Sequence, residues 1–244
     1  MNRTPRLLAI AALCAAAGTT QAQTAVGGGK GGTSFPIVLG QPGSYKLAGN
    51  LTVPLGVNAI EVAASNVTID LNGYTITGPV VCTGGYWTMS CTTGGKGIVQ
   101  TDGNAMNTTV RNGTVRGFTT AIHLGNAALV EDVTVTANGS YGLIAQEGSL
   151  VRNVRATYNR EAGMLVNHGV VSHSTSTLTP IGFHMTGGLL IAATTRTVTQ
   201  SLYGSYGGPS TSTGVRESVL SGGSTPTGGS VVSLGNNLCN GMPC

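Results

Sequence analysis

The chain has 244 residues, of which only 8% are charged, and its formal net charge is +4. A balance so close to neutral, without a basic stripe, argues against a nucleic-acid-binding surface. Glycine is abundant, with 39 residues, but hydrophobic residues make up 40% of the chain, and this apolar content excludes a disordered protein. The length predicts one folded domain.

Residues 1–22 have the pattern of a signal peptide. Arg3 and Arg6 precede an apolar run over residues 7–18, and a small-x-small cleavage pattern ends at Ala22. The apolar run is too short to span a bilayer, which argues against a transmembrane anchor. We therefore expect cleavage near Ala22 and a secreted or periplasmic protein, whose formal charge falls from +4 to +2 with the loss of the two arginines.

Four cysteines remain after this cleavage, namely Cys82, Cys91, Cys239 and Cys244. An even number in an exported chain indicates disulfides, and four cysteines allow three connectivities. The short separations favour the local pairs Cys82–Cys91 and Cys239–Cys244. A four-cysteine zinc site is the competing interpretation, but the chain lacks the C-x2-C unit that is typical of such sites.

A period of about twenty residues runs through the middle of the chain, which is the mark of a solenoid. Short β-type segments recur at this period, and alternation along each strand predicts two inward apolar stacks. The first stack contains Ile122, Leu143, Met164 and Phe183. The second contains Val110, Val130, Val151, Val171 and Ile191.

These units resemble the right-handed parallel β-helix proteins, the pectin-lyase-like fold of pectate lyases and many exported bacterial proteins. The resemblance rests on residues 67–73, on residues 112–118 and on the repeated glycine-apolar units. It implies an all-β, single right-handed parallel β-helix, with roughly seven to eight coils of about 20 residues. We expect an N-terminal extension at 23–42, the helix at 43–203 with a disulfide loop at 79–96, and a Gly/Ser/Thr-rich C-terminal coil and tail at 204–244. The fold leaves the chemistry open, because it carries enzymes, binding proteins and structural spikes.

Polar residues recur at the position that follows the second stack. They are Asn72, Asn112, Asp132, Asn153 and His173. Side chains repeated at one corner can hydrogen-bond to the backbone and to the next coil, so we interpret this series as a structural ladder.

Acidic residues do not coincide in neighbouring coils, whereas a calcium-dependent lyase or an inverting hydrolase needs grouped carboxylates. An outward column of Arg111, Glu131 and Arg152 remains, with Arg155 nearby. One interpretation is a surface ion-pair ladder. The other is a cationic patch for an acidic sugar, in which these four residues are the catalytic candidates of a metal-independent lyase.

Two further outward series bear on function. His123 and His184 share a position but lie three coils apart, roughly 14 Å, so we expect no metal site and no cofactor. Outward threonines suggest an ordered flat face, as in ice-binding solenoids, which Arg155 interrupts. These threonines are Thr114, Thr134, Thr175 and Thr195.

Tyr86 and Trp87 lie inside the expected disulfide loop. Aromatic side chains on a pinned loop can bind sugar faces or anchor a protein, although Trp87 could equally pack on the helix as a small satellite core. We expect a non-catalytic binding or surface-structural role, with a polysaccharide or cell-surface glycan as the favoured partner. The alternative is a metal-independent lyase of acidic polysaccharides. The sequence leaves the oligomeric state open.

Overall fold

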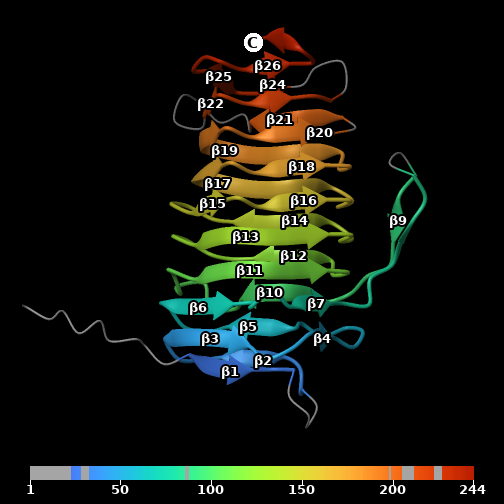
Figure 1. Ribbon diagram of the computed structural model, residues 1–244, viewed down its shortest axis with the longest axis vertical. Helices are drawn as coiled ribbons and strands as arrows, with labels where there is room; N and C mark the ends of the chain where they lie inside the picture. Colours follow the sequence, from blue (N-terminus) through green and yellow to red (C-terminus); the bar gives the residue numbers. More distant parts are fainter. Residues whose placement is uncertain (1–22, 29–32, 86–87, 198, 205–211, 223–226) are drawn as a thin grey trace, which may run out of the picture.

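The computed structural model describes residues 23–28, 33–85, 88–197, 199–204, 212–222 and 227–244. These residues form an elongated parallel β-helix of about nine turns, with roughly 21 residues per turn (Figure 1). The predicted all-β solenoid is therefore confirmed, with about nine turns in place of the seven to eight that were expected. The residues that would test the signal peptide, 1–22, lie outside the described part of the chain.

Each turn contributes strands to three parallel stacks, which we name A, B and C. Stack A contains β2 (Ile37–Leu39), β5 (Ile60–Val62), β10 (Lys96–Gln100), β12 (Thr120–His123), β14 (Tyr141–Ala145), the first halves of β17 (Ala162–Ser172) and β19 (Ile181–Ile191), β21 (Gln200–Gly204) and β24 (Thr227–Gly229). Stack B contains β1 (Thr24–Val26), β3 (Gly43–Leu47), β6 (Val67–Asp70), the first halves of β11 (Thr109–Arg116) and β13 (Leu129–Thr136), β15 (Leu150–Arg152), the second halves of β17 and β19, β22 (Thr213–Arg216) and β25 (Val231–Ser233). Stack C contains β4 (Leu51–Thr52), β7 (Thr75–Thr77), the second halves of β11 and β13, β16 (Arg155–Thr157), β18 (Thr175–Thr177), β20 (Thr194–Arg196), β23 (Val219–Leu220) and β26 (Leu238–Cys239).

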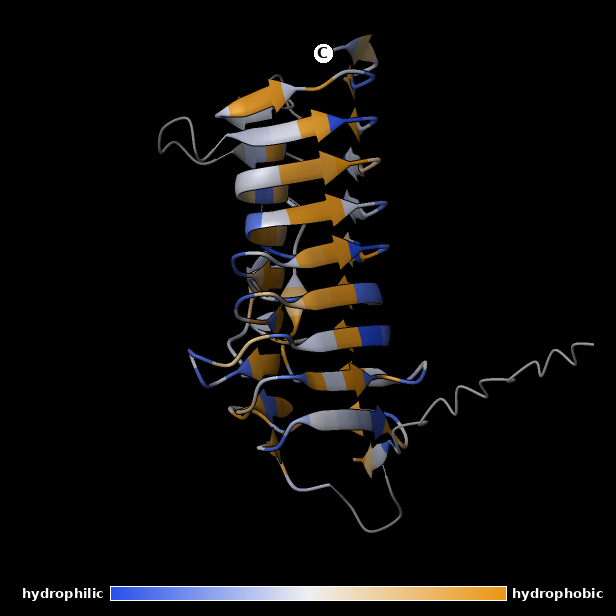
Figure 2. Ribbon diagram, turned by 90° about the vertical axis from the view of Figure 1, so that its left-hand side faces the viewer, coloured by the Kyte–Doolittle hydropathy of each residue, from blue (hydrophilic) through white to orange (hydrophobic). Residues whose placement is uncertain are grey.

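Apolar side chains in register fill the interior of the helix. Ile122, Leu143, Met164 and Phe183 pair in successive coils of stack A and are fully buried, as the sequence predicted. Figure 2 shows the same pattern as hydrophobic strand segments that lie above one another. Full burial of each such side chain contributes about 1.5–3 kcal/mol, so this column stabilises the stacking of the coils.

The second predicted stack is correct as far as Val171 and then shifts by one residue. Val171 pairs with Leu190, which is fully buried, whereas Ile191 pairs with Ser172 and is only partly buried. The cause is a shorter turn: residues 178–180 connect β18 to β19, whereas residues 158–161 connect β16 to β17. The strand that follows the shorter turn begins one residue early, and its inward positions move with it.

The β-helix extends beyond the predicted range 43–203 at both ends. Upstream, β1 pairs with β3 and β2 pairs with β5, inside the segment expected to be an extension. Downstream, β22, β25 and β26 continue stacks B and C within the segment expected to be a coil and tail. These terminal coils contain short strands with few large apolar residues, so their periodicity is faint in the sequence.

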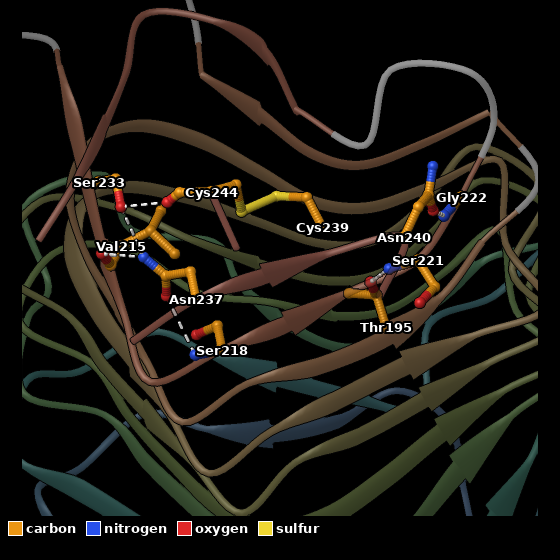
Figure 3. The surroundings of a disulfide bond; sticks show 10 residues. All are labelled: Thr195, Val215, Ser218, Ser221, Gly222, Ser233, Asn237, Cys239, Asn240 and Cys244. Atoms are coloured by element: carbon orange, nitrogen blue, oxygen red, sulfur yellow. Dashed lines mark hydrogen bonds between the residues drawn. A yellow bond between two sulfur atoms is a disulfide. The ribbon is translucent and has the colours of Figure 1, made fainter. Parts of the chain in front are cut away.

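Polar side chains and a disulfide close the C-terminal end (Figure 3). The buried Asn237 amide donates to the carbonyl of Val215 at 2.8 Å, and its oxygen accepts from the Ser218 N–H at 3.1 Å. The Cys239–Cys244 disulfide then holds β27 (Met242–Pro243) antiparallel to β26. The last coil is thus fixed by hydrogen bonds and a covalent link where apolar packing is sparse.

The Cys82–Cys91 disulfide closes a hairpin that leaves the helix after β7. Its strands, β8 (Cys82–Thr83) and β9 (Ser90–Cys91), pair antiparallel, and the hairpin stands on the side where β16 and β18 lie (Figure 1). The Tyr158 hydroxyl, three coils further along, donates to the Gly84 carbonyl at 3.0 Å. The two disulfides are thus the local pairs that the sequence favoured, Cys82–Cys91 and Cys239–Cys244.

Candidate functional site

The polar series predicted as a ladder lies at the corner between stacks B and C. Asn72, Asn112, Asp132, Asn153 and His173 all have positive φ, between 49° and 62°. Asparagine and aspartate tolerate this left-handed conformation better than most residues. Some side chains also link coils, because the Asn112 amide donates to Asp70 at 3.2 Å and the Asn153 amide donates to Asp132. Backbone geometry is therefore the main reason for the series.

The predicted outward column Arg111, Glu131 and Arg152 lies in register on stack B, and Asp70 precedes it. Arg111 pairs with Asp70 at 3.5 Å, and Arg152 pairs with Glu131. Each arginine is thus neutralised by a carboxylate of the coil before it. This geometry is that of a surface ion-pair ladder, in which each of the two arginines already contacts a carboxylate.

Arg155, the fourth predicted candidate, lies in a different place. It follows the Asn153 corner and projects from stack C, where it pairs in register with Thr134 and Thr175. The structure thus separates Arg155 from the ion-pair ladder and places it among threonines.

The outward positions of stack C form two parallel columns, which together we name the threonine–arginine face. The first column is Thr75, Thr114, Thr134, Arg155, Thr175 and Thr194. The second is Thr77, Arg116, Thr136, Thr157, Thr177 and Arg196. The residues between the columns, such as Val115 and Val135, are buried.

One residue of the predicted threonine column was misplaced. Thr195 points inward, is 2% exposed, and its hydroxyl accepts from the Ser221 N–H at 3.1 Å. Thr194 takes the outward position, because this coil is one residue shorter than the coil before it. The second column was missed, although Thr-x-Thr in residues 75–77, 134–136 and 175–177 is its signal in the sequence.

The threonine–arginine face carries cations without acidic partners. Among the residues that the structure describes, no carboxylate lies within ion-pairing distance of Arg116, Arg155 or Arg196. All three are exposed, while most of the threonines around them are half-buried. The face is therefore a regular array of hydroxyl and methyl groups from which three unpaired guanidinium groups project.

The disulfide hairpin borders this face. Tyr158, which holds Gly84, directly follows Thr157 of the second column. On the same edge, the Cβ of Cys91 lies close to Gly139, three residues after Thr136. Tyr86 and Trp87, the predicted ligand-binding aromatics, lie outside the described residues.

A second polar cluster lies on stack A. The Lys96 ammonium donates to Nδ1 of His123 at 2.9 Å, beside a hollow lined by side chains that include Gln100, Asp102 and Gln146. Burial first, and the Lys96 charge second, lower the pKa of His123. Burial alone also lowers the pKa of His184, which lies three coils further along the same column. Both rings therefore favour the neutral form.

The acidic side chains do not gather into a metal-binding cluster in the part of the chain that the structure describes. No group of three or more histidine, cysteine, aspartate or glutamate side chains is close enough there to hold a metal ion. Glu161 instead hydrogen-bonds the Tyr141 hydroxyl, and burial, followed by the Glu161 charge, raises the pKa of Tyr141. Asp70, Glu131 and Glu161 thus each contact a neighbouring side chain.

An asparagine pair in the interior was not predicted from the sequence. Asn138 and Asn159 are fully buried, and the Asn138 amide donates to the Asn159 Oδ1 at 2.8 Å. The Asn138 oxygen also accepts from the Phe118 N–H at 3.0 Å. Their separation of 21 residues, equal to one coil, was the available signal.

Comparison of the chain with protein-family models, curated proteins and solved structures found no match. Within the described residues, no helix is long and apolar enough to cross a membrane.

Proposed function

We propose that this chain is an exported, non-catalytic carbohydrate-binding protein, and that the threonine–arginine face is its binding surface. The observation that carries the proposal is the regular hydroxyl array on stack C, which spans six successive coils. Threonine hydroxyls both donate and accept hydrogen bonds, as sugar hydroxyls do, and their methyl groups offer apolar contact to sugar C–H groups. The coils repeat every ~4.8 Å, close to the length of one sugar ring in an extended chain.

Two features support export and a binding role. The two disulfides fit an oxidising compartment, which agrees with the signal-peptide pattern. The hairpin closed by Cys82 and Cys91 stands beside the face, and the sequence between these cysteines contains Tyr86 and Trp87, residue types whose aromatic rings suit contact with sugars. The resemblance to pectin-lyase-like proteins supports this proposal in one respect only: a long β-helix presents extended faces on which a polymer can bind.

The two threonine columns can also be compared with the surfaces of ice-binding solenoids. Arg116, Arg155 and Arg196 have longer side chains than the threonines beside them and interrupt both columns. A rigid crystal plane could not approach the threonines over this length. A flexible chain that accepts hydrogen bonds from guanidinium groups fits the face better.

A metal-independent polysaccharide lyase is the second candidate, and one observation favours it. The Lys96–His123 pair combines a cation with a neutral imidazole beside a hollow. The Lys96 charge could bind a uronate carboxylate while His123 accepts a proton from the sugar ring. The catalytic candidates are then Lys96 and His123. Arg111 and Arg152, the candidates expected from the sequence, instead form ion pairs with Asp70 and Glu131.

The test is a combined binding and turnover assay. The purified protein is incubated with immobilised acidic and neutral polysaccharides, and retained protein, ultraviolet absorbance from unsaturated ends and new reducing ends are measured. We expect retention without either product. Products that disappear in a Lys96→Met variant would establish the lyase, and absence of both retention and products would refute a carbohydrate ligand.

A further inference from the structure

The arginines of the threonine–arginine face recur at a regular interval. Arg116 lies on β11, Arg155 on β16 and Arg196 on β20. One coil separates each arginine from the next, and those coils present threonine at both outward positions: Thr134 and Thr136 on β13, and Thr175 and Thr177 on β18. The interval is thus two coils, or about 10 Å along the helix axis.

The charge of these arginines is directed to solvent. The neighbouring ladder on stack B shows the opposite arrangement, because Arg111 and Arg152 each contact a carboxylate from the preceding coil. On stack C, the residues in register with Arg155 are Thr134 and Thr175, which carry no charge. A guanidinium group without an internal partner forms strong, often bidentate, hydrogen bonds with a carboxylate or sulfate.

The two-coil interval selects among linear anions. About 10 Å is close to the length of a disaccharide in an extended sugar chain, and it is much longer than the ~3.4 Å of helix axis per phosphate along one strand of duplex DNA. The threonine coils between the arginines would contact the uncharged sugars. Arg155 is offset sideways by two residues, about 7 Å, from the column of Arg116 and Arg196, within the reach of long side chains.

Building on the proposed carbohydrate-binding function, on which this step rests, we propose that the threonine–arginine face binds a linear acidic polysaccharide with one anionic group per disaccharide. The chain lies along the helix axis, with its anionic groups on Arg116, Arg155 and Arg196. Its neutral sugars lie over the intervening threonines. The spacing of the arginines, in addition to their charge, then determines which polymer binds.

The test compares ligands of equal length and variants of equal charge. Hyaluronan and unsulfated chondroitin decasaccharides carry one carboxylate per disaccharide, polygalacturonate carries one per sugar, and chito-oligosaccharide and oligo(dT) serve as the neutral and nucleic-acid probes. Affinities are measured by titration calorimetry. The variants are Arg155→Thr, the charge-neutral exchange Arg155→Thr/Thr175→Arg, and Arg160→Gln, which removes an exposed arginine outside the face.

We expect at least one of the two disaccharide-repeat polymers to bind more tightly than the other probes. Arg155→Thr should weaken it about tenfold or more, the loss for one charge-assisted contact. The exchange should not restore binding, because it creates intervals of three coils and one coil, and Arg160→Gln should leave binding unchanged. Unaltered thermal unfolding shows that each variant is folded.

The contrary results separate the two proposals. If the exchange variant binds like the wild type, or if polygalacturonate or oligo(dT) binds most tightly, the two-coil spacing is refuted. Binding of chito-oligosaccharide alone, insensitive to Arg155, refutes this inference and retains a carbohydrate-binding function. Absence of binding to every sugar probe refutes both.

Discussion

The buried pair Asn138 and Asn159 provides a quantitative test of how polar groups hold the coils together. Both side chains are fully buried, and the Asn138 amide connects two coils through the Phe118 N–H at 3.0 Å and the Asn159 Oδ1 at 2.8 Å. Replacing Asn138 with alanine removes both contacts and leaves these two groups without those hydrogen bonds. A buried group without a partner costs about 1–3 kcal/mol, so we expect a loss of about 2–6 kcal/mol in the free energy of unfolding.

Equilibrium unfolding in urea, followed by circular dichroism, measures this loss. Asn126→Ala is the matched control, because Asn126 is exposed and its loss should change the stability by less than about 0.5 kcal/mol. The double variant Asn138→Ala/Asn159→Ala should lose less free energy of unfolding than the sum of the two single variants. In the double variant, neither asparagine remains in the interior without its hydrogen-bond partner. If Asn138→Ala costs no more than Asn126→Ala, the interior pair does not stabilise the stacking and the reasoning is wrong.

Three further predictions concern charge, pH and the terminal cap. Arg152→Gln should cost at most about 1 kcal/mol in urea unfolding, because its pair with Glu131 is at the surface; a loss above 2 kcal/mol would contradict this. Because burial lowers the pKa of His123 and His184 below the ordinary 6.5, the unfolded chain binds more protons, and the melting temperature should fall as pH drops below about 6.5. His184→Gln should flatten that pH dependence, and an unchanged slope would exclude His184 as a contributor. Replacing Cys239 and Cys244 with serine should speed amide hydrogen exchange in β26 while leaving β14 unchanged, since the disulfide closes only the last coil; equal acceleration in both strands would oppose a local role.

The repetitive part of the fold was predictable because stacking converts sequence period into spatial alignment. The column Ile122, Leu143, Met164 and Phe183 could be placed before any coordinates, since each inward position requires an apolar side chain. The prediction failed where a single turn changed length. The shorter turn at 178–180 moved Leu190 inward and displaced Ile191, and it exchanged Thr194 for Thr195 on the outer face.

The candidate site was less predictable than the core. Arg155 lies three residues after Arg152 in the sequence, yet the left-handed corner at Asn153 directs the two arginines to different stacks. Arg116, Arg155 and Arg196 are not equally spaced in the sequence and alternate between two columns, so no fixed sequence period reveals them. Their grouping emerges only from the paired register of stack C.

The threonines and arginines of stack C do not carry equal weight as functional evidence. Threonine is β-branched and common in strands, so a solvent-facing parallel sheet accounts for much of its abundance without any ligand. Stability does not account for the arginines, because Arg116, Arg155 and Arg196 have no acidic partner among the described residues, and placing like charges on one face is mildly unfavourable. The exchange of Arg155 with Thr175 isolates this point, since it preserves composition, charge and fold and alters only the interval between cations.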